Sequence, residues 1–414
     1  MDRYPELVAD KDRYPELVAD KDRYPELVVD KGKLADNIRE VVSRCAARGI
    51  SVAGVIKGMN GLPDLIKVYA ESDVAMIGSS RIEQIRDAAT IGRKDPALCK
   101  PTLMIRIPML SEVPEIVKYC DYSLESEDET LRALNEEVLR QEAPLKKHKV
   151  ILMAEMGDLR EGYVGDDLVR AALMVEDDLD GLELAGVGMN VGCYGSILPT
   201  RDKLDEFVAR AEAVEAAIGR KLDIISGGAT STLMRVLDGD IPERINHLRI
   251  GEGILLAHDL PLFYGCDMAF LHDDVFRLRM EVVEVKLKPT YPQGTIGRDA
   301  FGHEPEYIDR GNRMRAICAC GKVDYGSETD IFPLRPGIKV IGASSDHTLL
   351  DVEELFKGEE QSKGEAFKVE DMRVVEDLHK NQAPLKVGDV LDFSINYASM
   401  VYVTSSRNIH IIYK

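Results

Sequence analysis

A single lysine ends an apolar segment in the first part of the chain. The sequence "GISVAGVIKGMNG" runs from Gly49 to Gly61, and Lys57 stands between small or apolar residues and a glycine-containing turn. A strand of this kind places an amine at the edge of a buried sheet, where burial lowers the pKa of lysine. A neutral amine in that position can form a Schiff base with an aldehyde. The alternative is a surface lysine beside a loop, which is the usual place for lysine.

Two later turns have the composition of anion-binding sites. The first, "ISGGATST", contains Ser226, Gly228 and Thr230 just before a helical pattern, and the second, "LRIGEGI", contains Gly251 and Glu252. Bare backbone amides and hydroxyl groups in such turns can hold a phosphate. Either turn alone is more often only a turn. Together with a lysine that faces them, they suit a phosphorylated aldehyde, for which pyridoxal 5'-phosphate is the natural candidate.

The elements that carry these residues alternate between strand and helix patterns, which indicates parallel strands. Eight strands are expected, at Ile50–Lys57, Val74–Gly78, Thr102–Ile107, Cys120–Leu124, Lys149–Glu155, Leu182–Asn190, Leu222–Ser226 and His247–Gly251. Helices are expected between them, among others at Arg81–Ala89, Asp128–Arg140, Asp166–Val175, Arg201–Ile218 and Thr232–Leu237. The predicted fold class is α/β, with a (β/α)8 TIM-type barrel whose site lies at the carboxyl ends of the strands.

The chain after Gly253 is rich in β patterns and in glycine and proline turns, which favours a second, mostly antiparallel β domain. Its expected strands are Val275–Lys286, Arg313–Val323, Lys339–Gly342, Val390–Asn396 and Met400–Tyr413. We expect the barrel over residues 33–262, and the β domain over 22–32 plus 270–414 with a charged surface insertion at 353–382.

The first residues repeat a ten-residue sequence. DRYPELVADK occupies 2–11 and 12–21 and returns at 22–31 with Val29 in place of alanine. The period is too short for a solenoid repeat. The third copy predicts a strand that leads into a helix, and residues 1–21 are interpreted as duplicated segments without a binding role.

Composition excludes several classes of partner. The chain of 414 residues carries 53 Lys and Arg against 73 Asp and Glu, for a net charge of −20, which disfavours nucleic acid. Seven cysteines at irregular spacing form no zinc pattern, so no metal site is expected. Neither a signal peptide nor a membrane-length apolar run is visible. We therefore expect a cytoplasmic protein without a membrane partner.

Motifs in order along the chain resemble those of the alanine racemase-type (fold type III) pyridoxal phosphate enzymes. They are "GVIKGMNG", "LMIRIPML", "MGDLREGY", "GMNVGCYG", "ISGGATST", "LRIGEGI" and "IGASSDHTLLDV", spread from about residue 50 to residue 352. The resemblance implies pyridoxal 5'-phosphate as cofactor and racemisation of a free amino acid. It also implies a homodimer in which the β domain of one subunit completes the site of the other.

The resemblance also assigns roles to individual residues. It implies that Lys57 binds the cofactor covalently, that Arg249 faces the pyridine nitrogen and that Asn190 lies near the ring. Further residues are implied around the phosphate, namely Ser226, Gly228, Thr230, Gly251 and Glu252. Arg160 matches the arginine near the substrate carboxylate, and Cys193 and Tyr194 are expected beside the substrate.

One motif departs from the family pattern and concerns the second base of a two-base mechanism. Where alanine racemases carry a catalytic tyrosine in the β domain, this chain has Lys322 within "GKVDYG". We therefore expect the second base to be His347 or Asp346, from "SSDH", with Cys193 and Tyr194 as less favoured candidates. The alternative for Asp346 is to hold a cationic substrate tail. Histidine has a suitable pKa near neutrality, and a structural role in a β turn is the alternative for His347.

The expected substrate is the diamino acid ornithine, interconverted between its L and D forms. Its side-chain ammonium needs a carboxylate, for which Asp158, Glu161 and Glu252 are candidates. The alternatives are a racemase of lysine or of a broader range of amino acids, and a non-catalytic carrier of pyridoxal phosphate.

Overall fold

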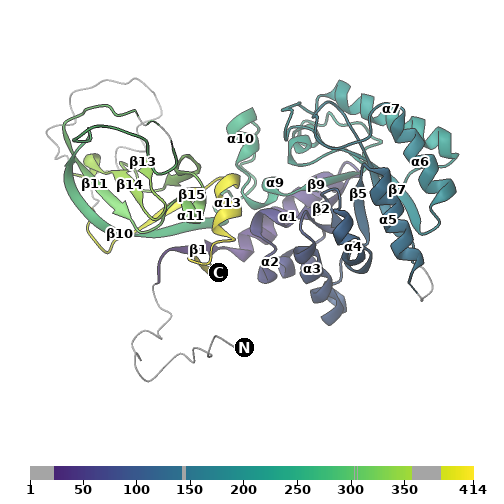
Figure 1. Ribbon diagram of the computed structural model, residues 1–414, viewed down its shortest axis with the longest axis horizontal. Helices are drawn as coiled ribbons and strands as arrows, with labels where there is room; N and C mark the ends of the chain where they lie inside the picture. The colour runs from purple at the N-terminus through teal and green to yellow at the C-terminus, as the bar shows by residue number, and fades with distance from the viewer. Residues whose placement is uncertain (1–22, 142–145, 303, 305, 357–383) are drawn as a thin grey trace.

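The computed structural model of the protein describes residues 23–141, 146–302, 304, 306–356 and 384–414. The two duplicated segments and most of the charged insertion lie outside the described residues. Figure 1 shows a helix-covered barrel on one side and a β-rich part on the other, with α10 and α13 near the junction.

The barrel predicted from the strand and helix pattern is confirmed. Eight parallel strands close on themselves in chain order: β2 (Ser51–Val55), β3 (Met76–Ser79), β4 (Thr102–Met104), β5 (Tyr122–Glu125), β6 (His148–Ala154), β7 (Leu182–Met189), β8 (Ile224–Ser226) and β9 (His247–Ile250). Apolar side chains from alternate positions, including Ala53, Leu103 and Ile151, fill the interior. The interior is therefore a packed core, and any site must lie at its ends.

Helices cover the barrel because their apolar faces pack on its outer surface. They are α1 (Lys31–Ala46), α2 (Pro63–Glu71), α3 (Ile82–Lys94), α4 (Val113–Tyr119), α5 (Asp128–Leu139), α6 (Asp167–Asp178), α7 (Arg201–Ile218), α8 (Leu233–Leu237), α9 (Glu252–Leu255) and α10 (Asp259–Tyr264). In the described residues, none of the helices has the length and apolar content needed to span a bilayer.

The second part is built on a mostly antiparallel sheet. Its strands are β1 (Glu26–Val29), β10 (Phe276–Pro289), β11 (Asn312–Cys318), β12 (Ile331–Pro333), β13 (Lys339–Ala343), β14 (Thr348–Asp351), β15 (Val390–Ile395) and β16 (His410–Tyr413). The third sequence repeat forms β1, which pairs antiparallel with β10 and parallel with β16. Because β1 is buried along its whole length, its last three residues form a continuous apolar run rather than an alternation.

Two predictions for the β domain are wrong in part. Residues Tyr397–Val403 form helix α13, where β structure was expected from Met400 onward. The Asn396 side chain accepts a hydrogen bond from the Ser399 amide and caps the helix, and Met400 packs into the core. The strand expected over Arg313–Val323 ends at Cys318, and residues Lys322–Tyr325 form the short helix α11. Tertiary packing overrides the β propensity of the valines and tyrosines here.

Helix α13 braces the turn that carries Lys57. This turn is the 3-10 helix η2 (Lys57–Met59) after β2. The Thr404 hydroxyl donates to the Gly58 carbonyl over 3.3 Å, and the Asn60 side-chain amide donates to the Thr404 carbonyl over 3.3 Å. A Cβ at Gly58 would stand 2.8 Å from Cε2 of Tyr397. The β domain therefore fixes the geometry of the lysine turn in the same chain.

We predict that Gly58→Ala lowers the free energy of unfolding by about 1–3 kcal/mol, because the added methyl group overpacks the contact with Tyr397. Chemical denaturation of purified protein measures this. Gly342→Ala is the matched control, since a Cβ there meets nothing within 4 Å. Equal stability of the two variants would show that η2 and α13 do not pack as described.

Candidate active site

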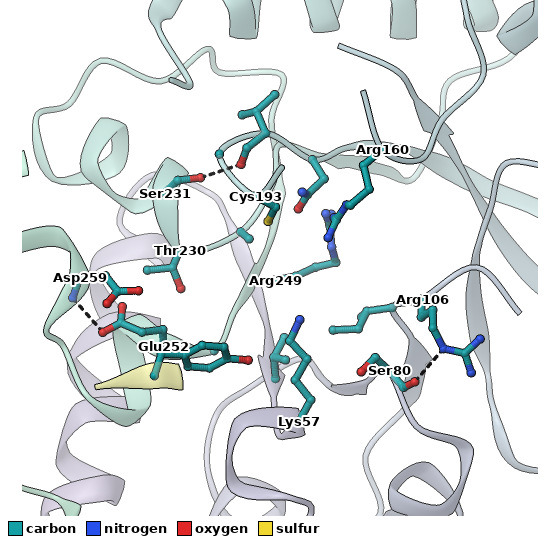
Figure 2. Close-up of a pocket in the computed structure, with 18 of the residues that line it drawn as sticks. Lys57, Ser80, Arg106, Arg160, Cys193, Thr230, Ser231, Arg249, Glu252 and Asp259 are labelled. Carbon is teal, nitrogen blue, oxygen red and sulfur yellow. Dashed lines mark hydrogen bonds between the residues drawn. The ribbon is translucent and has the colours of Figure 1, made fainter. Parts of the chain in front are cut away.

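A cavity of about 740 Å³ opens at the carboxyl ends of the barrel strands. Its walls come from the loops after the strands, from α10 and from Tyr397 of α13 (Figure 2). Nine residues predicted for the site line this cavity: Lys57, Arg160, Glu161, Asn190, Cys193, Thr230, Arg249, Gly251 and Glu252. The sequence motifs therefore converge in space, although they lie far apart in the chain.

The amine of Lys57 points into the middle of the cavity (Figure 2). The side chain is exposed, but the space it faces is the cavity, and protein surrounds the amine on most sides. Burial lowers the pKa of Lys57, and the positive charges of Arg160 and Arg249 lower it further. No hydrogen bond or ion pair from the described residues holds this amine, so it is free to react.

Arg249 is held rigidly beside Lys57. One guanidinium nitrogen donates to the Ser226 hydroxyl, and another donates to the Met189 carbonyl over 2.9 Å. Burial lowers the pKa of Arg249 to about 10, so the group stays charged at neutral pH. The Ser226 hydroxyl is also 2.8 Å from Nδ1 of His247. Burial lowers the pKa of His247 to about 3, so the neutral imidazole adds no charge.

Two buried polar atoms of cavity-lining residues have no hydrogen-bond partner among the described residues. They are Nδ2 of Asn190 and Oε2 of Glu252. Leaving a buried polar group unpaired costs free energy, so such atoms indicate where a ligand makes contacts. The other Glu252 oxygen, Oε1, accepts from the backbone amides of His258 and Asp259.

Arg160 enters the cavity paired with its neighbour Glu161. The loop around it is held by the Glu155 carboxylate, which accepts hydrogen bonds from the amides of Leu159 and Arg160. Arg106 also lines the cavity, and its guanidinium binds both carboxylate oxygens of Glu112 at 2.7 Å. Two arginines, each already paired with a glutamate, therefore lie on one side of Lys57 in Figure 2.

Asp158 joins the loops after β6 and β7. Its buried carboxylate accepts hydrogen bonds from four successive amides, those of residues 192–195, at 3.1–3.3 Å. The carboxylate thus places Cys193 at the cavity wall. An acid that is saturated by backbone donors is a positioning group, and it is not available to a substrate ammonium.

Four of the predicted barrel residues lie outside the lining of the cavity, all of them within the described part of the chain: Asp158, Ser226, Gly228 and Tyr194. Ser226 and Gly228 are buried behind it, where Ser226 contacts Arg249. Tyr194 is 72% exposed, on the loop that Asp158 holds.

The structure brings together the two β-domain motifs that were considered for a second base. The amides of Lys322 and Val323 donate to the carbonyls of Ser344 and Ser345, so "GKVDYG" and "SSDH" form one patch. His347 and Asp346 are exposed there, and Lys322 pairs with Glu328 at 2.9 Å. Among the described residues of one chain, none of this patch lines the cavity.

Sequence reasoning missed several residues of the cavity, among them Tyr397 and Asp259. Tyr397 comes from the β domain, and no local motif marks it. Burial raises the pKa of Tyr397 to about 12, so its hydroxyl stays protonated and can donate. Asp259 begins α10, only ten residues after Arg249. Its position shortly after the Gly251 turn was the one sequence signal that could have identified it. The described residues contain no cluster of His, Cys, Asp and Glu that could hold a metal ion.

Comparisons with known proteins show which family the chain belongs to. Residues 29–259 match the family model described as alanine racemase, N-terminal domain. The chain is 34% identical to an ornithine racemase of Acetoanaerobium sticklandii over 372 residues. This alignment covers 89% of this chain and 94% of that protein. It is 33% identical over 383 residues to a lysine racemase of Thermotoga maritima, which covers 92% and 96%.

Solved structures share the fold at low sequence identity. An alanine racemase of Streptomyces lavendulae superposes with a TM-score of 0.65 at 13% identity, over 95% of this chain and 98% of that one. A D-threonine aldolase of Filomicrobium marinum superposes with a TM-score of 0.62 at 14% identity, over 92% and 88%. The family model and the two racemase relatives together show that this chain belongs to the alanine racemase family.

Proposed function

We propose that the protein is a pyridoxal phosphate-dependent racemase that interconverts L- and D-ornithine. The observation that carries the proposal is the unpaired Lys57 amine, which shares one cavity with Arg249, Arg160 and the glycine-containing turns at Thr230 and Gly251. The names of the two full-length relatives support a diamino acid substrate. The second candidate is a racemase of lysine or of a broader range of amino acids.

The residues present fit pyridoxal phosphate. Lys57 supplies the amine for its aldehyde, and Asn190 offers an unpaired amide to the ring. The turn at Thr230 and the amides of Gly251 and Glu252 are proposed to hold the phosphate, with the buried turn at Ser226 and Gly228 behind them. The turn at Gly251 packs tightly against the turn at Thr230, since a Cβ at Gly253 would stand 3.0 Å from the Thr230 side chain. This close packing supports the assignment. When bound, the cofactor accepts the electron pair left at Cα when the substrate loses its proton.

The positive charge of Arg249 affects which reaction of the bound substrate is favoured. Because its guanidinium stays protonated, it would donate to the ring nitrogen and keep that nitrogen free of a proton. The negative charge is then drawn less strongly into the ring, which favours return of the proton to Cα over side reactions. A decarboxylase more often places a carboxylate at this position, so Arg249 favours a racemase.

Lys57 is proposed as the base on one face of the substrate. Its lowered pKa makes a neutral amine more accessible near neutral pH, as a general base requires. Arg160 is proposed to bind the substrate carboxylate, which fixes the Cα–H bond relative to the amine. Cys193 and Tyr194 lie on the loop beside Arg160 and are proposed to contact the substrate.

The base for the other face is proposed to come from a second copy of the chain. His347 and Asp346 are the candidates, and neither reaches the cavity of its own chain. Large apolar side chains are exposed on the loops and helix around the cavity, namely Leu159, Tyr194, Leu262, Phe263 and Tyr264. An apolar rim of this kind is typical of a surface that another protein covers. A homodimer would cover the rim and complete the site.

A carrier of pyridoxal phosphate without catalysis remains the alternative from another class. Such proteins resemble the barrel alone. Here the β domain contributes Tyr397 to the cavity wall and braces the Lys57 turn. These contacts favour a full enzyme.

We predict that the protein loaded with pyridoxal phosphate absorbs near the visible edge, and that borohydride bleaches this band and fixes the cofactor to Lys57. Peptide mass mapping locates the attachment. Lys57→Ala should lose the band and reduce racemisation of L-ornithine by about 10²–10⁴-fold or more, measured as loss of optical rotation. Lys67→Ala, an exposed lysine on α2, is the control. Label on any other lysine would refute the assignment.

We predict that His347→Ala slows exchange of solvent deuterium into one enantiomer of ornithine by about 10²–10⁴-fold, and far less into the other, because each base serves one face. Mass spectrometry of the separated enantiomers measures both rates. Asp346→Asn and Lys322→Ala, tested in parallel, show which side chain of the patch is the base. Small and equal losses for both enantiomers would remove His347 from the mechanism.

A further inference from the structure

The carboxylates of the cavity differ in how much of their hydrogen-bonding capacity is already used. Three acidic residues line it: Glu161, Glu252 and Asp259. Glu161 is paired with Arg160 through both of its oxygens. Asp158, which lies close by, is saturated by four backbone amides. These two acids are therefore occupied before any substrate arrives.

Asp259 has a carboxylate group without a hydrogen-bond or ion-pair partner among the described residues. Its oxygens accept no hydrogen bond and form no ion pair within the described residues, although its own backbone amide donates to Glu252. Burial raises the pKa of Asp259, and the nearby His258 offsets this rise only in part. A cation placed beside it would reverse that shift.

Glu252 provides a second, independent observation at the same place. This residue is 7% exposed, and Oε2 has no partner while Oε1 accepts two amides. Burial, together with the charge of Asp259, raises the pKa of Glu252 to about 7. Figure 2 shows the two side chains next to one another, and the 2.9 Å bond from the Asp259 amide to Glu252 confirms their proximity.

The two sides of the cavity thus differ, with unpaired carboxylate oxygens on one side of the reactive amine and arginines that are each paired with a glutamate on the other. Glu252 and Asp259 lie on one side of Lys57 in Figure 2, and Arg106 and Arg160 lie on the other. A diamino acid also has two different ends, with a carboxylate at one end and a side-chain ammonium at the other. An ammonium carries three donors and no acceptor, which matches two carboxylates with free oxygens.

We propose that Asp259, together with Oε2 of Glu252, binds the side-chain ammonium of a diamino acid and so selects it over neutral amino acids. The inference rests on the proposed function for the identity of the substrate. It also resolves an electrostatic conflict, because the carboxylates stand next to the turns proposed to hold a phosphate. A cation between the two anions removes their repulsion.

The test compares L-ornithine with L-norleucine, in which a methyl group replaces the ammonium. Equilibrium binding to the cofactor-loaded protein is followed by the spectral change, and turnover is measured in parallel. Asp259→Asn should weaken ornithine binding about 10–100-fold, as for loss of a charged hydrogen bond, and should reduce the preference for ornithine over norleucine by the same factor. Glu252→Gln should reduce this preference less, since Asp259 remains.

Asp202→Asn, an exposed residue of α7, controls for the change in net charge. The affinity of each variant for pyridoxal phosphate is titrated as well. If Asp259→Asn changes cofactor affinity and leaves ornithine binding as in the parent, then Asp259 carries a proton facing the phosphate, and the inference is wrong. If the parent binds ornithine without racemising it, and Asp259→Asn weakens that binding, then the subsite stands and the proposed function fails.

Discussion

The site depends on keeping one lysine amine unpaired inside a charged cavity. The amine of Lys57 has no acceptor among the described residues, and its burial disfavours the protonated form, with smaller contributions from Arg160 and Arg249. A lysine in water would be protonated and unreactive at neutral pH. The surrounding structure therefore has to bury the amine and to give the cations near it partners other than Lys57.

The chain meets this requirement with carboxylates and backbone groups placed just outside the cavity. Ser226 and the Met189 carbonyl hold Arg249, and Glu161 neutralises Arg160. Carboxylates that accept several amides, those of Glu155 and Asp158, fix the loops around Arg160 and Cys193. The β domain adds a brace from Thr404 and Tyr397 to the lysine turn. Each contact limits the movement of a charged group, so the free amine stays where a ligand can reach it.

The part of this arrangement that was predictable follows from periodic patterns and short motifs. Alternating strands and helices fix a closed barrel, and a barrel fixes which strand ends meet, so Lys57, Arg249 and the Gly251 turn could be placed together from sequence. Tyr397 could not be, because its position depends on how the β domain docks on the barrel. Helix α13 was missed for a related reason: its valines and tyrosines favour strands locally, and only the Asn396 cap and burial of Met400 make it a helix. The second base follows neither from the sequence patterns nor from the structure of a single chain, since His347 does not reach the cavity of its own chain.

The most direct test of the central claim is a crystal structure of the protein purified with pyridoxal phosphate. The account predicts continuous electron density from the Lys57 side chain to the cofactor, the phosphate at the turns of Thr230 and Gly251, and Arg249 facing the ring nitrogen. A cofactor attached to another lysine, or a Lys57 side chain turned out of the cavity into bulk water, would contradict it.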